Sequence, residues 1–320
     1  MNFGIYIGSV AGTDKDLAVG KPDNPNAIQD ALKKLEQDGH SLIIRGYIHY
    51  LGNGKTGNEA PDNIIQYATT TRKIDLVLCY RSPKYDQRDW TNTIRNVIQK
   101  YGDHLHSFQI AEEPNLKDVF SGDGSFDDIY NALRDGVLTA KKEVGKCKNQ
   151  IEVGFNAAMS FDPKDNFWNF IGSNDCIPLR DAIDYIGLDF FPDVFRPLPE
   201  EGFPGNLTST VKYVLHHFRN VVLNSGKIPL SVPVCITENG WSTGGSRSYE
   251  RQALIIETII RALNEVKHEL NIRSYELFSL RDADSKNDDL FYQFGILKDD
   301  YTPKPAFHKF RELIQELGGG

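Results

Sequence analysis

Cysteine is scarce in this sequence and never occurs in a metal-binding pair. The four cysteines, Cys79, Cys147, Cys176 and Cys235, show no C-x-x-C or similar spacing, so they do not predict a zinc site. Cys79 and Cys235 lie in apolar, strand-like runs, where a thiol usually serves as a small buried hydrophobe. We therefore expect reduced, structural cysteines, and neither a metal nor another cofactor.

Excess positive charge, long apolar runs and nucleotide-binding motifs are lacking as well. Lys and Arg total 36 against 44 Asp and Glu, and the net charge of −8 disfavours binding to a nucleic-acid backbone. No stretch reaches the roughly 18 apolar residues of a membrane helix, and the first residues, MNFGIYIGSV, lack the features of a secretory leader. We expect a cytoplasmic protein, or a secreted one if a leader was removed, that binds neither nucleic acid nor membrane.

Short β-branched apolar runs alternate with longer stretches of helical periodicity, as in repeated βα units around a parallel sheet. The expected strands are 3–7, 42–47, 76–80, 108–111, 151–155, 183–188, 234–237 and 275–278. The expected helices are 27–37, 90–101, 127–144, 208–224, 249–270 and 305–317. A doubly wound open sheet would alternate in the same way, but no G-x-G-x-x-G follows the first strand and no G-x-x-x-x-G-K-[ST] occurs. The pattern predicts an α/β protein with a single (β/α)8 TIM barrel over residues 1–320.

Two of the expected strands run directly into glutamate. The segment 108–115, FQIAEEPN, places Glu112 and Glu113 before Pro114, and the segment 232–241, VPVCITENGW, contains Glu238. Because the residue before proline favours extended geometry, we expect Glu113 to end its strand rather than to begin a helix. These are the fourth and seventh strands, and the C-terminal ends of barrel strands converge on one pocket. The two carboxyls are therefore expected to meet there.

Two carboxyls in one pocket supply the chemistry of glycosidic bond cleavage. One protonates the leaving oxygen, while the other attacks the anomeric carbon or activates water. The proton donor needs a pKa that burial and a charged neighbour have raised.

The motifs A-E-E-P at 111–114 and I-T-E-N-G-W at 236–241 resemble the two catalytic motifs of the clan A glycoside hydrolases, which are retaining (β/α)8-barrel enzymes. Weaker similarity at Arg45 and in the segments 185–192, 295–298 and 303–306 extends over most of the chain. The resemblance implies a hydrolase of β-linked oligosaccharides, polysaccharides or small glycosides. It further implies that Glu113 is the general acid/base, that Glu238 is the nucleophile and that Arg45 supports the nucleophile.

The sequence departs from the clan pattern at two positions. Glu112 stands where the clan has an Asn that bonds the sugar 2-hydroxyl, and an ionised Glu can accept such a bond but cannot donate one. Glu112 is also a rival for the acid role. Phe278 stands on the eighth strand, where the clan usually has a Trp platform. Both departures leave the identity of the sugar open.

Further side chains complete the predicted substrate site. Asn156 and Asp189, at the ends of the fifth and sixth strands, are candidates for contacts with hydroxyl groups, although either could instead cap a loop. Aromatic side chains near strand ends are candidates for sugar platforms or for rim packing: Tyr80, Phe190, Trp241 and Phe278.

Other functions compete with hydrolysis by two glutamates. A non-catalytic, carbohydrate-binding or regulatory barrel would share the fold without turnover. A metal-dependent hydrolase would need converging His and carboxylate ligands, and no H-x-H follows the first strand. A chitinase-type barrel would need its acids on the fourth strand, whereas Asp184 and Asp189 lie near the sixth.

Overall fold

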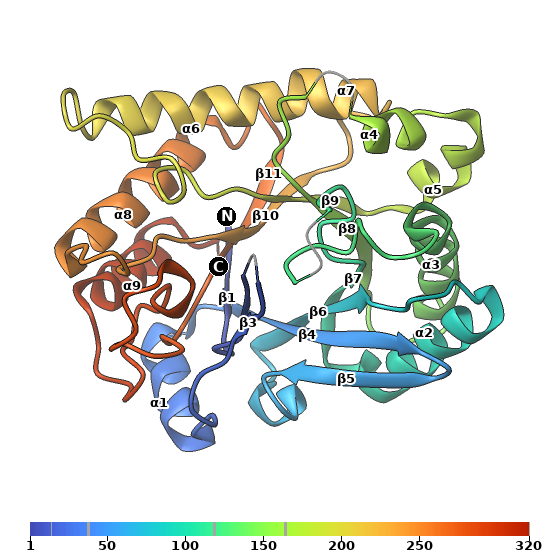
Figure 1. The fold of residues 1–320 in the computed structure, drawn as a ribbon, viewed down its shortest axis with the longest axis horizontal. Coiled ribbons are helices and arrows are strands. Elements are labelled where there is room, and N and C mark those ends of the chain that lie inside the picture. Colours follow the sequence, from blue (N-terminus) through green and yellow to red (C-terminus); the bar gives the residue numbers. More distant parts are fainter. Residues whose placement is uncertain (14, 37–38, 118–119, 163–164, 320) are drawn as a thin grey trace.

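The computed structural model describes residues 1–13, 15–36, 39–117, 120–162 and 165–319, and in it eight parallel strands form a closed barrel (Figure 1). In barrel order the strands are β1 (Asn2–Tyr6), β4 (Leu42–Gly52), β6 (Arg72–Tyr80), β7 (Leu105–Ile110), β8 (Glu152–Ala158), β9 (Tyr185–Asp189), β10 (Val234–Asn239) and β11 (Ile272–Leu277). The pairing of β1 with both β4 and β11 closes the barrel. Each predicted strand overlaps an observed one, and the predicted (β/α)8 barrel is confirmed.

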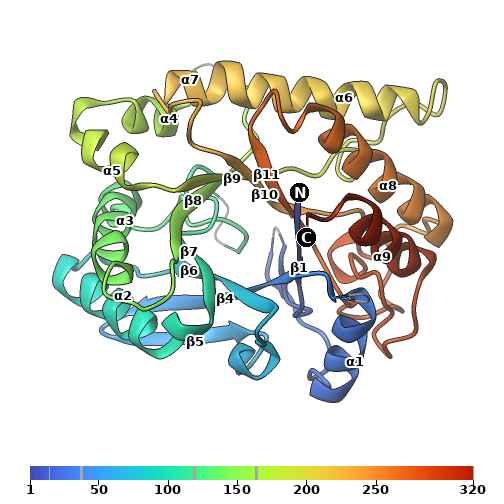
Figure 2. The same cartoon turned by 180° about the vertical axis from the view of Figure 1, so that it is seen from behind.

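Helices surround the barrel on its outer side (Figures 1 and 2). They are α1 (Pro25–Leu35), α2 (Gln87–Tyr101), α3 (Ile129–Val144), α4 (Asn166–Ile171), α5 (Ile177–Ala182), α6 (Gly205–His217), α7 (Leu223–Ser225), α8 (Tyr249–Val266) and α9 (Pro305–Leu317). Side-chain caps start several of them. Asn24 accepts from two backbone N–H groups of α1, and Asp86 and Ser248 cap α2 and α8 in the same way.

The predicted helix 208–224 is interrupted in the structure. After α6, a π-helical turn, η5 (Phe218–Val222), precedes the short α7. Arg219 in this turn is buried and donates to the backbone carbonyls of Leu270 at 2.9 Å and Val232 at 3.0 Å. These long-range bonds favour a widened turn, which local periodicity cannot reveal.

Short strands and single-turn helices are added to the barrel. β5 (Lys55–Ala60) pairs antiparallel with β4, and β2 (Ala11–Gly12) forms a hairpin with β3 (Leu17–Ala18). The single-turn helices are η2 (Ile64–Tyr67), η3 (Gly102–His104), η4 (Asn174–Cys176) and η6 (Leu290–Tyr292). Among the helices of the described ranges, none combines the length and hydropathy needed to cross a bilayer.

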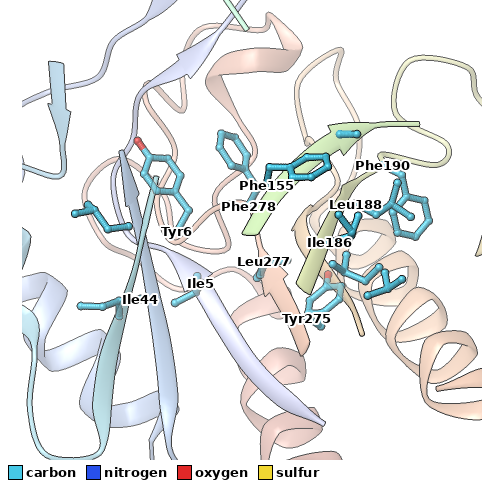
Figure 3. Packing of buried hydrophobic residues seen from close by; sticks show 14 of the residues in the cluster. Ile5, Tyr6, Ile44, Phe155, Ile186, Leu188, Phe190, Tyr275, Leu277 and Phe278 are labelled. Atoms are coloured by element: carbon cyan, nitrogen blue, oxygen red, sulfur yellow. The ribbon is translucent and has the colours of Figure 1, made fainter. Parts of the chain in front are cut away.

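The interior of the molecule contains both apolar and polar buried side chains. Apolar side chains pack continuously between strands and helices, and Figure 3 shows several of them from β1, β4, β9 and β11. Polar side chains from the strands are also buried at the barrel, among them Arg45, Asp75, Gln109 and Glu276. All four cysteines are free thiols, and three of them are buried.

Candidate active site

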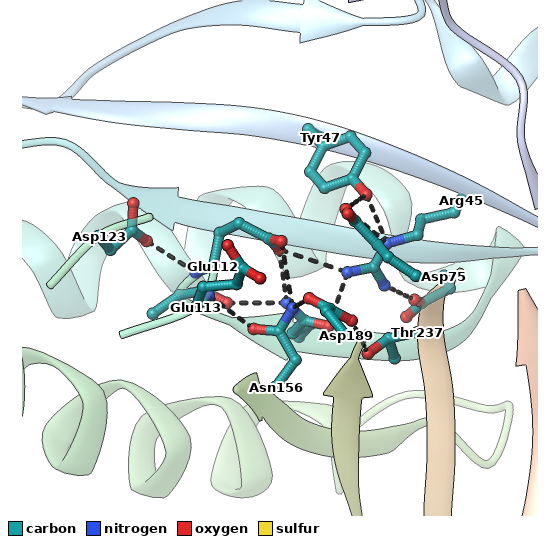
Figure 4. A network of polar contacts seen from close by, with 12 residues as sticks. Arg45, Tyr47, Asp75, Glu112, Glu113, Asp123, Asn156, Asp189 and Thr237 are labelled. Atoms are coloured by element: carbon teal, nitrogen blue, oxygen red, sulfur yellow. Dashed lines mark hydrogen bonds and ion pairs between the residues drawn. The ribbon is translucent and has the colours of Figure 1, made fainter. Parts of the chain in front are cut away.

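Arg45 on β4 is the hub of a buried polar network at the strand ends (Figure 4). Its side chain is inaccessible to solvent and donates to Asp75 on β6 and, at 3.0 Å, to Gln109 Oε1 on β7. It also contacts Glu112 Oε2 at 3.3 Å. The guanidinium presents its donors in a rigid fork, so neighbouring strands are held around one positive charge.

Glu238 lies near the end of β10, where the strand pairing is irregular. The register of β10 shifts after Ile236 against both neighbouring strands, and such bulges re-aim side chains next to active sites. The Tyr47 hydroxyl donates to Glu238 Oε1. Arg45 Nε lies 3.9 Å from that oxygen and donates to the Tyr47 hydroxyl at 2.7 Å. A phenol and a guanidinium from β4 therefore hold this carboxylate.

Glu112 lies against Glu238. One of its carboxylate oxygens is within 4.8 Å of an oxygen of Glu238. Its Oε2 accepts from Arg45 and, at 2.9 Å, from Gln109 Nε2, while its Oε1 accepts from Asn156 Nδ2 at 3.1 Å. Glu112 is the acceptor in all three bonds, which fixes its place in the network.

Glu113 is positioned by its backbone, and its side chain lines a cavity. Its N–H donates to Asn156 Oδ1 at 2.8 Å. Within the described part of the chain its carboxylate has no hydrogen-bond partner. Burial and then the negative charge of Glu112 raise the pKa of Glu113 well above its ordinary value. A carboxyl in these surroundings favours its protonated form.

The chain turns sharply between β7 and these acids. Ala111 has a φ of 64° and Glu113 a φ of 41°, in the left-handed region that residues with a β-carbon rarely adopt. The expectation that Glu113 is extended is therefore wrong, although no helix begins there. Asp123, from the following loop, accepts the N–H of Glu112 at 2.7 Å and that of Tyr80 at 2.6 Å. These two hydrogen bonds to Asp123 fix the backbone of the turn.

Asn156 and Asp189 join the network from β8 and β9. Asn156 is fully buried and donates to Asp189 as well as to Glu112. Thr237 donates to the other Asp189 oxygen at 2.5 Å. Asn156 therefore orients the acids from beneath the cavity, whereas Asp189 is part of the cavity lining.

Acids outnumber cations here, and the excess is met by protonation. We name Glu112, Glu113, Asp189 and Glu238 the acid cluster. Burial, then the charge of Glu112, raises the pKa of Glu238 to about 8, against the opposing effects of Arg45 and of the Tyr47 hydrogen bond. Burial and then Glu238 raise the pKa of Asp189 well above its ordinary value. Glu113, Asp189 and Glu238 therefore favour their protonated forms more than carboxyls in water do.

The acid cluster forms one end of a cavity of about 890 Å³. The predicted site residues that line it are Glu112, Glu113, Asp189, Phe190, Glu238 and Phe278. Arg45 and Asn156 are fully buried and contact the acids from below. Six of the ten predicted site residues thus reach the cavity, and two more support it.

Tyr80 and Trp241 do not belong to the described lining of the cavity. Tyr80 is fully buried, with its ring 5.3 Å from that of Trp90 on α2. Trp241 is buried and donates to Asp193, with Arg247 stacked on its ring at 4.9 Å. Both pack against other parts of the fold, so the structure gives them packing roles rather than platform positions.

The sequence did not single out several polar residues that line the cavity, among them Tyr47, His49 and Arg81. A signal for Tyr47 was present, because alternate strand residues share a face and Tyr47 follows Arg45 by two positions. Arg81 pairs with Asp123 at 2.7 Å, a contact that only the fold brings about. Burial lowers the pKa of His49 to about 4, so His49 is neutral at physiological pH.

The acid cluster also offers ligands of the type that hard divalent cations prefer. Single oxygens of Glu112, Asp189 and Glu238 lie within 4.8 Å of one another. However, Arg45 already contacts two of these acids, and Asn156 donates to Glu112 and Asp189. The absence of a metal cofactor stays a prediction.

Comparison with known proteins gives structural relatives only. No family model and no curated protein matches the chain. A family 1 β-glucosidase from Thermotoga maritima superposes with a TM-score of 0.63 at 13% identity, covering 100% of this chain and 98% of that one. A fungal β-1,4-galactanase gives 0.64 at 11% identity, covering 98% and 99%. A family 39 glycoside hydrolase from Bacteroides cellulosilyticus WH2 gives 0.59 at 15% identity, covering 99% of this chain but 64% of that one.

At these identities the similarity establishes the fold. The matched chains are described as a family 39 glycoside hydrolase, a family 1 β-glucosidase and a β-1,4-galactanase, and this chain shares their fold.

Proposed function

We propose that the protein is a retaining glycoside hydrolase of β-linked glycosides, with Glu238 as nucleophile and Glu113 as general acid/base. One observation carries the proposal. Two acids that line one cavity have different partners: Tyr47 and Arg45 hold Glu238 and lower a pKa that burial raises, while the Glu113 carboxyl lines the cavity with a raised pKa and no such partners in the described chain. These are the surroundings that a nucleophile and a proton donor require.

Cleavage proceeds in two displacements. Ionised Glu238 attacks the anomeric carbon while the bond to the leaving oxygen breaks, and that oxygen takes the proton of Glu113. Water then attacks the same carbon and gives a proton to Glu113, which releases Glu238 and restores both groups. Covalent attachment removes the charge of Glu238, one of the causes of the raised Glu113 pKa, so Glu113 becomes better suited to act as a base.

Glu113 fits the acid role better than Glu112 does. Three donors engage the oxygens of Glu112, which leaves this carboxylate as a fixed acceptor. We assign Glu112 and Asp189 to sugar hydroxyls and Phe190 and Phe278 to the apolar faces of the substrate. Arg45 and Asn156 act as positioning residues.

A panel of p-nitrophenyl β-glycosides tests the proposal. The wild type is expected to release p-nitrophenol from at least one sugar, and E238A to lose at least about 10⁴-fold of that activity, as nucleophile variants do. In E113A, azide is expected to restore turnover and to give a glycosyl azide with the starting configuration. E112Q is the matched control, which azide should not rescue. Rescue of E112Q instead of E113A would exchange the two assignments.

Two other outcomes separate the competing functions. Glycan binding without turnover on any glycoside would indicate a carbohydrate-binding barrel in place of an enzyme. Loss of activity on treatment with EDTA, restored by a divalent cation, would indicate that the acids hold a metal.

A further inference from the structure

The cavity has two chemically different parts. Its polar side chains include those of the acid cluster together with Tyr47, His49 and Arg81, and further polar residues also line it: Asn58, Glu59, Ser121, Asp193, Arg196 and Thr210. Much of the remaining lining is apolar and comes from the loops that follow the strands and from α6. The volume of about 890 Å³ lies near the upper end of the roughly 300–1,000 Å³ found for pockets that take drug-sized ligands. There is room beyond a single sugar ring.

A run of rings in contact, mostly edge to face, extends from the nucleophile to solvent. We name it the aromatic wall: Tyr6, Phe278, Phe191, Phe294, Phe195 and Phe291. The ring of Tyr6 lies 5.0 Å from that of Tyr47, which bonds Glu238, and stacks on Phe278 at 5.0 Å. Phe191 follows at 6.2 Å from Phe278, and Phe195 at 6.2 Å from Phe191. Figure 3 shows the inner end of the wall, with Tyr6 and Phe278.

The outer end of the cavity exposes apolar surface at an unusual density. Ten large apolar side chains are exposed in the described chain, and five of them line this cavity: Val19, Phe120, Phe161, Phe195 and Tyr213. Phe195 is 52% exposed and Phe161 54%. Contiguous exposed apolar surface marks a binding site.

The aromatic residues are also of the wrong kind for a chain of sugars. All three tryptophans are buried, and none of them belongs to the described lining. Further sugar units would need polar partners for their hydroxyls. Polar residues such as Arg196 and Thr210 do line the cavity, but the phenylalanine rings that form most of its aromatic surface offer no hydrogen bonds.

We infer that the preferred substrate is a glycoside whose aglycone is a large apolar group, with the sugar at the acid cluster and the aglycone along the aromatic wall. This inference deepens the proposed function and depends on it. Hydrophobic burial supplies the recognition, so affinity is set by apolar area rather than by hydrogen bonds. A long alkyl chain and a fused-ring aglycone share this chemistry.

The test uses ethyl, butyl, hexyl and octyl β-glycosides of the sugar that the aryl panel selects, each below its micelle concentration, beside the corresponding disaccharide. The wild-type kcat/KM is expected to rise about threefold to fourfold for each methylene buried. Fused-ring glycosides in a second arm identify which apolar aglycone is preferred.

Two variants of exposed rings in the lining test the inference, one at Phe195 of the aromatic wall and one at Phe161 outside the wall, and a third variant is the control. F195A and F161A should lower the gain from chain length about threefold to tenfold. L230A removes a side chain that is 69% exposed and outside the lining, and it should change nothing. Because all three positions are exposed, the variants should fold.

Several results would overturn the inference. A flat alkyl series, or a disaccharide preferred tenfold or more, would overturn it while the proposed hydrolase stands. If F195A abolishes binding to phosphatidylcholine vesicles but leaves the chain-length dependence unchanged, the apolar surface serves a membrane instead. Calorimetric titration of E238Q separates the two proposals: binding that strengthens with chain length supports the apolar site even if the wild type cleaves nothing.

Discussion

The acid cluster and the aromatic wall face the same cavity but are built differently. Each acid sits on or directly after a barrel strand, is largely buried, and shares neighbours such as Arg45 and Asn156 with the other acids. The wall draws much of its outer part from loops, and its members contact one another through ring packing. Polar contacts in a buried network depend on one another, whereas exposed apolar contacts are nearly independent. The cluster should therefore be sensitive to single changes and the wall tolerant of them.

The largest effect is expected from removing the shared cation. In R45M the neighbouring acids stay buried without their guanidinium, and breaking a buried ion pair from one side costs about 3–5 kcal/mol. Urea unfolding at pH 7 measures the loss in the free energy of unfolding. R45K keeps the charge but not the fork, and should lose less. A loss in R45M below about 1 kcal/mol would show that the cluster is not held through Arg45.

Removing the hydroxyl of Tyr47 should impair catalysis. Y47F deletes a hydrogen bond to the nucleophile, and bonds to charged groups contribute about 1.5–3 kcal/mol, so kcat/KM should fall about tenfold to a hundredfold. The bond lowers the pKa of Glu238. The acidic limb of the pH profile of kcat/KM should therefore move to higher pH. An unchanged limb with reduced activity would assign Tyr47 to packing alone.

Ionisation of Glu238 should lower the free energy of unfolding as the pH rises. The pKa of Glu238 is about 8 in the folded protein, above its ordinary value of 4.5. Between these values the folded state holds a proton that the unfolded state has lost, so stability falls as pH rises through this window. E238Q cannot ionise and should be more stable than the wild type at pH 9 by about 2 kcal/mol, although inactive. Thermal unfolding at pH 5 and pH 9 measures the difference, and equal curves at both pH values would contradict it.

Neutralising Glu112 should produce the opposite pH effect to Y47F. The charge of Glu112 is, after burial, the main cause of the raised Glu238 pKa. In E112Q the acidic limb of kcat/KM should move to lower pH by about one unit or more. The glutamine keeps the size of the side chain, although its amide meets the Asn156 donor. If the acidic limb of the E112Q profile stays at the wild-type pH, burial alone raises the pKa of Glu238.

The smallest effect is expected at the wall. F195A removes a half-exposed ring at the surface, and such changes usually alter stability by no more than about 0.5 kcal/mol. Its activity on a small aryl glycoside should stay within about twofold of the wild type. A large loss on that substrate would mean that the wall shapes the acid cluster, and the contrast between the two regions would disappear.

Strand periodicity and motif position were sufficient to predict the barrel and to place two glutamates at the ends of its strands. Apolar runs recur at the βα spacing, and Glu113 and Glu238 follow the fourth and seventh runs. The direction in which a strand-end side chain points was harder to predict. Tyr80 and Phe278 both follow apolar runs, yet Tyr80 packs against Trp90 on α2 while Phe278 lines the cavity.

The sequence by itself determined the eight barrel strands and which acids stand at their ends, because hydrophobic period and chain order are local properties. Only the tertiary structure decided the charge state and surroundings of those acids. Asp123 and Asn156, 11 and 44 positions beyond Glu112, turn its backbone and bind its side chain, and Glu112 in turn raises the pKa of Glu238. Electrostatic effects and loop packing depend on distances in space, and the closed barrel alone brings these groups together.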